Sequence, residues 1–263
     1  MDKLSVAFEH RAAFEIFYSA ANKHLVENTR ALGIKMRRFK IAIEQPLLQL
    51  AADKLTSLFG DAYMNEIPIE FEFFTTSPNG NSGGTDFVFD DNPEIGFQIN
   101  FNKNLKAIYH KDIRLFCLTL ADVFTHELIH GIQYIKQYQS VGIHESLLKE
   151  SLFKNKEHHF LLDSRYKIPQ YTEDLPYFSK HEELVCYAKD TARQLLTIYK
   201  DKKIIFDKLS NTDSLEELSK VSDCFYYYYD CFYVKIPGLE QYQILWHRFI
   251  KHLCHNINED FAI

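Results

Sequence analysis

The sequence predicts an α+β protein that is mainly helical, with a small antiparallel or mixed sheet in the first half of the chain. Two observations lead to this class. Apolar residues recur at three-to-four spacing over most of the 263 residues, whereas the stretch 66–102 alternates apolar and polar residues with a period of two. Because the predicted strands are grouped between helices, α+β fits better than an alternating α/β arrangement.

The first 60 residues predict N-terminal helices. They are rich in good helix formers, and their apolar residues have helical spacing. Pro46 predicts a break before Leu47–Gly60, because proline lacks a backbone N–H and its ring clashes with the preceding turn. We therefore expect two or three helices in this segment.

The sheet is expected between residues 66 and 102. Ile67–Phe74 alternates apolar with acidic side chains, as a half-buried strand does, and the turn-rich stretch Ser77–Gly84 should end it. Phe87–Phe89 and Gly96–Asn102 predict two more short strands. We expect Gly96–Asn102 to lie at an edge of the sheet.

The rest of the chain is predicted to be helical again. Segment 112–200 holds two long helices, Asp112–Tyr138 and His181–Tyr199, joined by an irregular polar connection over Lys154–Asp174. Further helices are expected within 214–258, at Leu215–Val221, Asp223–Tyr233 and Leu239–Ile257. Since no repeat or low-complexity linker divides the chain, we interpret residues 1–263 as one domain.

Composition and charge exclude several classes of function. A formal net charge of −6 does not provide the basic surface that nucleic acid requires. The N-terminus has acidic residues and no continuous apolar run, so no secretory signal is expected, and no apolar run is long enough to predict a membrane span. The five cysteines lack C-x-x-C spacing, which predicts free thiols and a cytoplasmic location.

The motif with chemical meaning is H-E-x-x-H at His126, Glu127 and His130. Residues four apart lie on one face of a helix, so the two imidazoles can hold one metal ion. Zinc lowers the pKa of a bound water to about 7. The neighbouring carboxylate of Glu127 can then act as general base and later return the proton to a leaving amine.

The helix around the motif supports this interpretation. At about 100° per residue, the apolar residues form one stripe, namely Phe124, Leu128, Ile132 and Ile135. The polar residues gather on the opposite side, namely His126, His130 and Gln133. We therefore expect the histidines to face away from the core stripe.

A third protein ligand must come from elsewhere, because a catalytic zinc usually has three. The extended metzincin pattern fails, since position 133 is Gln and position 136 is Lys. The stretch His126–Gln133 resembles the active-site helix of gluzincin metallopeptidases, and His181–Ala188 resembles the later helix that carries their glutamate ligand. The second stretch is similar to the E-x-x-A-Y-A segment of uncharacterised, often phage-encoded, H-E-x-x-H proteins.

The resemblance implies a zincin-like fold, Zn²⁺ as cofactor and a glutamate ligand on the later helix. We assign that ligand to Glu183, because Tyr187 and Asp190 then share its helix face. It also implies that Tyr187 donates to the developing oxyanion. Asp190 is a candidate partner for the outer N–H of a ligand imidazole.

Other third ligands remain open. Glu182 is the nearest competitor to Glu183, and three histidines are alternatives, namely His144, His158 and His159. A second zinc site is disfavoured, because the spacing of the C-terminal Cys and His residues fits no structural zinc pattern: Cys224, Cys231, His247, His252, Cys254 and His255.

Together these features predict a zinc-dependent metallopeptidase acting on a peptide or protein substrate, whose backbone adds to an edge strand beside the metal. Two alternatives are an inactive zincin scaffold that binds a protein partner and a metal-dependent hydrolase of a non-peptide bond. Retention of Glu127 argues against the scaffold. The substrate and the oligomeric state do not follow from the sequence.

Overall fold

The computed structural model describes residues 5–25, 32–77, 82–88, 93–102, 113–141, 181–234 and 240–259. Contacts between Cα atoms divide the chain into two compact units, which consist mainly of Met1–Glu145 and of Ser146–Glu259. Each unit is described by itself. The interpretation of 1–263 as one domain stays a prediction, because two compact units can belong to one domain or to two.

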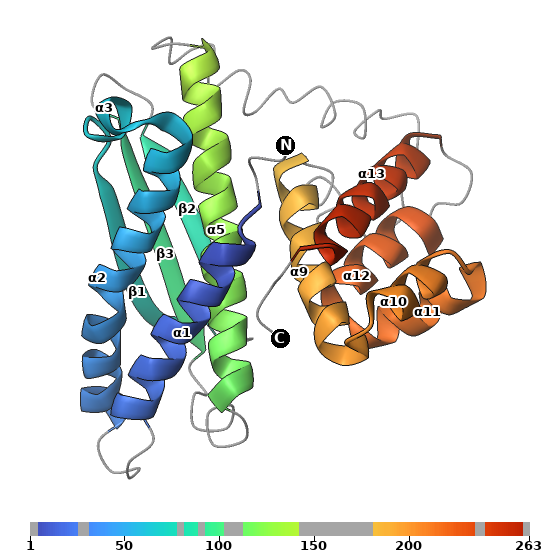
Figure 1. Ribbon diagram of the computed structural model, residues 1–263, viewed down its shortest axis with the longest axis horizontal. Helices are drawn as coiled ribbons and strands as arrows, with labels where there is room; N and C mark the ends of the chain where they lie inside the picture. Colours follow the sequence, from blue (N-terminus) through green and yellow to red (C-terminus); the bar gives the residue numbers. More distant parts are fainter. Residues whose placement is uncertain are drawn as a thin grey trace. The chain divides into compact units, whose positions relative to one another are not determined.

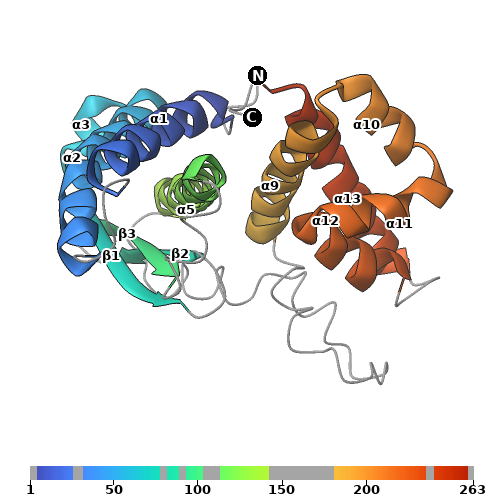
Figure 2. The same ribbon diagram turned by 90° about the horizontal axis from the view of Figure 1, so that it is seen from below.

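The first unit combines helices with a three-stranded sheet. Its elements follow in the order α1 (Ala7–His24), α2 (Leu32–Phe59), α3 (Asp61–Met64), β1 (Ile69–Ser77), β2 (Ser82–Val88), β3 (Glu94–Asn102) and α5 (Ile113–Val141). Helix α2 contacts β1, and α5 contacts β2 and β3, so both helices cover the same face of the sheet (Figures 1 and 2). Helix α1 packs on α2 and α5 as an outer layer.

Phenylalanine rings fill the centre of this unit, where its layers meet. Phe39 of α2 lies 5.9 Å from Phe101 of β3, 6.3 Å from Phe116 of α5 and 6.5 Å from Phe17 of α1, measured between ring centroids. All four residues are fully buried. Burial of a large apolar side chain contributes roughly 1.5–3 kcal/mol, so this cluster holds the helices on the sheet.

The predicted break at Pro46 is wrong, since α2 continues through this residue. Proline removes one helical hydrogen bond at a cost of about 3 kcal/mol. The helix compensates with a continuous stripe of fully buried residues on both sides of the proline: Phe39, Ile43, Leu47, Ala51 and Leu55. Pro46 itself is exposed, so its ring disturbs no core contact.

The sheet has the strand order β1-β3-β2. Strand β3 pairs in parallel with β1 and antiparallel with β2. The expectation that Gly96–Asn102 forms an edge is therefore wrong, because this segment is the central strand. The predicted turn also ended too late, since Ser82–Gly84 already belong to β2. Among the described strands, β1 and β2 are the edges, and β2 is the edge that lies beside Glu127 of α5.

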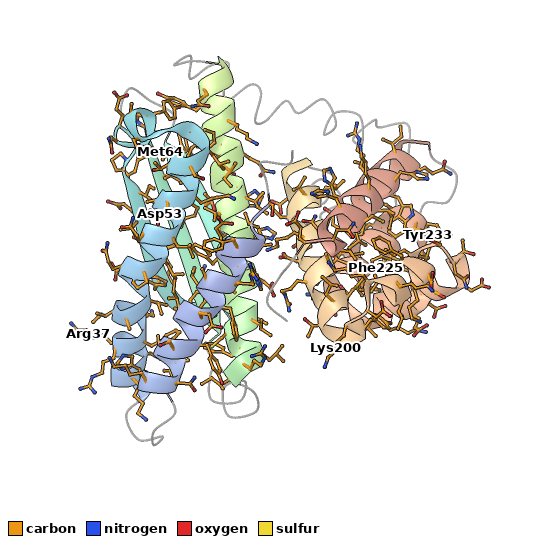
Figure 3. The ribbon with its side chains drawn as sticks, viewed as in Figure 1. Arg37, Asp53, Met64, Lys200, Phe225 and Tyr233 are labelled. Carbon is orange, nitrogen blue, oxygen red and sulfur yellow. The ribbon has the colours of Figure 1, made fainter. Side chains whose placement is uncertain are left out.

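Over its described residues, the second unit consists of helices joined by short loops and has no strand. It contains α9 (His181–Tyr199), α10 (Lys202–Leu209), α11 (Thr212–Val221), α12 (Asp223–Tyr228), the π-helix η2 (Tyr229–Val234) and α13 (Glu240–Ile257). Its core includes Phe225, shown in Figure 3, and the stacked rings of Tyr228 and Phe249, whose centroids are 4.2 Å apart. The α9 bounds agree with the prediction, whereas α10 and the π-helix were not predicted.

The α+β class is confirmed: the described residues form helices and one small mixed sheet. All five cysteines are free thiols, as predicted. One window, Ile113–Lys136 in α5, is long and apolar enough to cross a membrane, which the sequence analysis did not anticipate. Because 78% of that window is buried inside the protein, α5 has the character of a core helix.

Candidate functional site

Helix α5 carries the H-E-x-x-H motif and is held from two sides. Its apolar stripe is buried as predicted, with Phe124, Leu128, Ile132 and Ile135 all at most 1% exposed. On the α1 side, the buried His10 ring places Nε2 3.0 Å from Oδ1 of Asp122, one turn before His126. This contact fixes α1 against the part of α5 that leads into the motif.

The two motif histidines lie next to each other on α5. Their ring centroids are 5.0 Å apart, and the rings are inclined by 67°. His130 is buried and His126 is half-buried. The spacing of four residues thus brings two imidazoles together on one helix face, as the motif predicts.

Gln133 holds the His130 ring. Its Oε1 lies 3.2 Å from Nδ1 of His130. When the amide oxygen accepts a hydrogen bond from this nitrogen, Nδ1 carries the proton and the lone pair of Nε2 is directed to a metal. This is the arrangement of a metal-ligating imidazole whose other nitrogen donates to an outer partner. Imidazole nitrogen is one of the donors that Zn²⁺ takes, so His126 and His130 are candidates to hold that ion.

The Glu127 side chain points toward strand β2. The hydroxyl oxygen of Thr85 lies 2.8 Å from Oε2 of Glu127 and 2.9 Å from its backbone oxygen. Gly83 is also in contact, since a Cβ on this glycine would come within 2.5 Å of both Cγ and Oε1 of Glu127. Glu127 as a whole is 7% exposed, and its carboxylate lies against an edge strand.

Sequence reasoning missed both Thr85 and Gly83. Gly83 was assigned to a turn because it lies among Gly, Asn and Ser residues. Thr85 carries no motif signal. Correct placement of β2 would have revealed both, because alternate residues of a strand share a face and thus a common neighbour.

The residues predicted to complete the site lie in the second unit. Glu183, Tyr187 and Asp190 are all on α9, and Glu183 and Asp190 are buried. The approach of Glu183 to the two histidines stays a prediction. His144, His158 and His159 lie outside the described residues, as does the side chain of Glu182.

Within their own unit, Tyr187 and Asp190 have neighbours that the sequence did not suggest. The Tyr187 ring lies 5.8 Å from Tyr228 and 6.4 Å from Tyr227, measured between centroids, so it packs on α12. Asp190 forms an ion pair with Lys189 at 2.5 Å. Its predicted role toward a ligand imidazole is not tested by this contact.

Two members of the disfavoured second zinc site have partners close by. The Cys224 sulfur accepts a hydrogen bond from Gln194, and Nδ1 of His247 lies 2.6 Å from the backbone oxygen of Gln243. These contacts are within or between neighbouring helices of the second unit. They give Cys224 and His247 structural roles that do not require a metal.

Comparison of the chain with protein-family models, with curated proteins and with solved structures gives no match.

Proposed function

We propose that this protein is a zinc-dependent peptidase in which His126 and His130 bind the metal, Glu183 is the third ligand and Glu127 is the general base. One observation carries the proposal: a carboxylate and two imidazoles lie within a single turn of a buried helix, and the carboxylate lies against an edge strand. Burial of ionisable groups costs free energy, so the buried Glu127 and His130 beside the half-buried His126 make this turn a candidate functional site.

The chemistry follows from the types of group present. When bound, zinc would activate a water molecule and polarise the substrate carbonyl. Glu127 would take the proton of the attacking water and deliver it to the leaving amine. Tyr187 would donate a hydrogen bond to the oxygen of the carbonyl under attack.

The edge strand favours a peptide as substrate over a compound that has no peptide backbone. A strand at an edge offers unpaired N–H and C=O groups to an extended peptide. The central position of β3 removes the edge that the sequence analysis proposed, and β2 takes over this role because it is the described edge strand beside Glu127. A peptide added to β2 would extend the sheet past the catalytic carboxylate.

The deciding experiment measures metal content first and hydrolysis second. Purified protein should contain about one zinc per chain, and His126→Ala should lose it. A peptide library would then supply a substrate. Glu127→Gln keeps the size of the side chain but removes the basic oxygen, so zinc should remain while the rate falls by about 10²–10⁴.

The alternatives give different results in the same experiment. Zinc binding with hydrolysis of a non-peptide substrate alone would point to another kind of hydrolase. Zinc binding without any hydrolysis would favour a scaffold for a protein partner. A protein without zinc, or a Glu127→Gln variant with the wild-type rate, would contradict the proposal.

A further inference from the structure

We infer that Thr85 and Gly83 of β2 act as a clamp that positions the Glu127 carboxylate for catalysis. Thr85 is a positioning residue in this scheme, and Gly83 supplies the space that the carboxylate needs. We call these two residues the β2 clamp. The catalytic part of the inference rests on the proposed peptidase function, whereas the physical coupling between the clamp and Glu127 does not.

The register of the sheet explains why these two residues meet Glu127. In the antiparallel pair, Gly83 lies opposite Ile99 and Thr85 lies opposite Phe97. Ile99 and Phe97 are buried on the face of β3 that the helices cover. Because directly opposite residues project to the same face, the β2 clamp faces α5.

Thr85 fixes the direction of the carboxylate. Its hydroxyl carries one proton and has two acceptors within reach, Oε2 and the backbone oxygen of Glu127. The bond to a charged carboxylate is the stronger one, so it should be preferred when Glu127 is ionised. Threonine is also stiff at χ1, which limits the positions that the hydroxyl can occupy.

Gly83 allows the carboxylate to lie directly on the strand. A Cβ at this position would overlap both Cγ and Oε1 of Glu127, at 2.5 Å each. Cγ lies near the base of the side chain, so a rotation of the carboxylate alone cannot relieve this overlap. Only glycine at position 83 is compatible with the observed conformation of Glu127.

The clamp has a consequence for the reaction. A carboxylate held on β2 is kept beside the backbone edge where an extended substrate would pair. A general base must lie within about 2.6–3.2 Å of the proton that it removes, and a displacement of about 1 Å can cost about 100-fold in rate. Loss of the clamp should therefore lower kcat while it leaves KM and zinc content unchanged.

The first test needs neither substrate nor metal. Thr85→Val is close in shape but lacks the hydroxyl, and its urea midpoint is compared with that of the parent in two backgrounds, wild type and Glu127→Ala. We expect Thr85→Val to lower the midpoint more in the wild-type background than in Glu127→Ala, where only the hydrogen bond to the backbone oxygen of residue 127 is left to lose. Equal shifts in both backgrounds would show that Thr85 and Glu127 are not coupled and would overturn the inference.

The second test uses the peptidase assay. Thr85→Val should reduce kcat by about 10–100-fold with KM nearly unchanged, and Thr85→Ser should recover most of the activity because it restores the hydroxyl. Combined with Glu127→Gln, Thr85→Val should cause no further loss, because it acts through Glu127. A further loss in the double variant, or a serine variant as slow as the valine variant, would contradict a positioning role.

Gly83→Ala tests whether the space between β2 and Glu127 must stay open. It should lower kcat about as much as Glu127→Gln and retain zinc. Gly96→Ala in the central strand β3 is the matched control, since nothing lies within 4 Å of its Cβ position, and it should keep the wild-type rate. Equal rates for both glycine variants would overturn the role of Gly83. If the wild-type protein hydrolyses no peptide, the proposed function fails, and the midpoint test still decides whether the clamp exists.

Discussion

Gly131 of α5 lies directly against Phe97 of β3, so that a Cβ on the glycine would come within 2.9 Å of the ring Cζ. The Cδ1 atom of Ile95 would be even closer, at 2.7 Å. Gly131 is one helical turn after Glu127, on the same side of α5. The close approach of α5 to the sheet at Gly131 therefore also sets how near Glu127 comes to β2.

Gly131→Ala should destabilise the first unit. Overpacking of a core typically costs about 1–3 kcal/mol, and the higher helix propensity of alanine returns up to about 1 kcal/mol. We expect a net loss of about 1–2 kcal/mol in urea denaturation. Gly96→Ala is the control and should change stability by no more than about 0.5 kcal/mol. An unchanged midpoint for Gly131→Ala would mean that Ile95 and Phe97 can move aside freely.

Pro46→Ala should have the opposite effect. The substitution restores a backbone N–H in the middle of α2 and removes the clash with the carbonyl of Ala42. Since proline costs about 3 kcal/mol relative to alanine in a helix interior, we expect a gain of about 1–3 kcal/mol in the free energy of unfolding. Gln45→Ala, at the exposed neighbouring position, should stay within about 0.5 kcal/mol. A loss of stability would show that packing of the buried stripe depends on the proline.

Helix α9, Pro46 and Gly83 show what the sequence could and could not predict. Long periodic stretches such as α9 were located correctly, because a helix with one buried face leaves a clear pattern. Pro46 misled the prediction. Proline locally favours the end of a helix, but the buried stripe of α2 stabilises the helix through this residue, and that burial is not visible in the local sequence. Gly83 misled it as well, since glycine in a strand and glycine in a turn look alike in sequence.

The site was predictable only where its residues are local in sequence. His126, Glu127 and His130 occupy one turn, so helix geometry alone brings them together. The contact between Glu127 and Thr85 joins residues 42 positions apart and depends on sheet order and register. The wrong edge assignment of Gly96–Asn102 has the same origin, because strand order is not encoded in the alternation of one strand.

Substitution tests which residue is the third ligand of the proposed zinc site. We predict that Glu183→Ala lowers zinc affinity more than about 100-fold, beyond the 10–100-fold that outer partners typically cause. Glu182→Ala and His144→Ala are the matched comparisons and should bind zinc as the wild type does. Competition with a chromophoric chelator measures all three. If His144→Ala is the variant that loses zinc, the ligand set is three histidines and the gluzincin assignment is wrong.

Gln133→Ala tests whether the contact with His130 supports metal binding. The amide oxygen of Gln133 lies 3.2 Å from Nδ1 of His130, and its removal takes away the partner that would orient the ring and favour the Nδ1–H tautomer. We expect zinc affinity to fall by about 10–100-fold in chelator competition, with the free energy of unfolding of the metal-free protein changed by less than about 0.5 kcal/mol. Gln139→Ala is the control, because this exposed glutamine lies on the same helix and should leave zinc affinity unchanged.

A Gln133→Ala variant with wild-type zinc affinity would mean that His130 needs no outer partner for binding. A similar loss in both glutamine variants would instead indicate a general effect on α5.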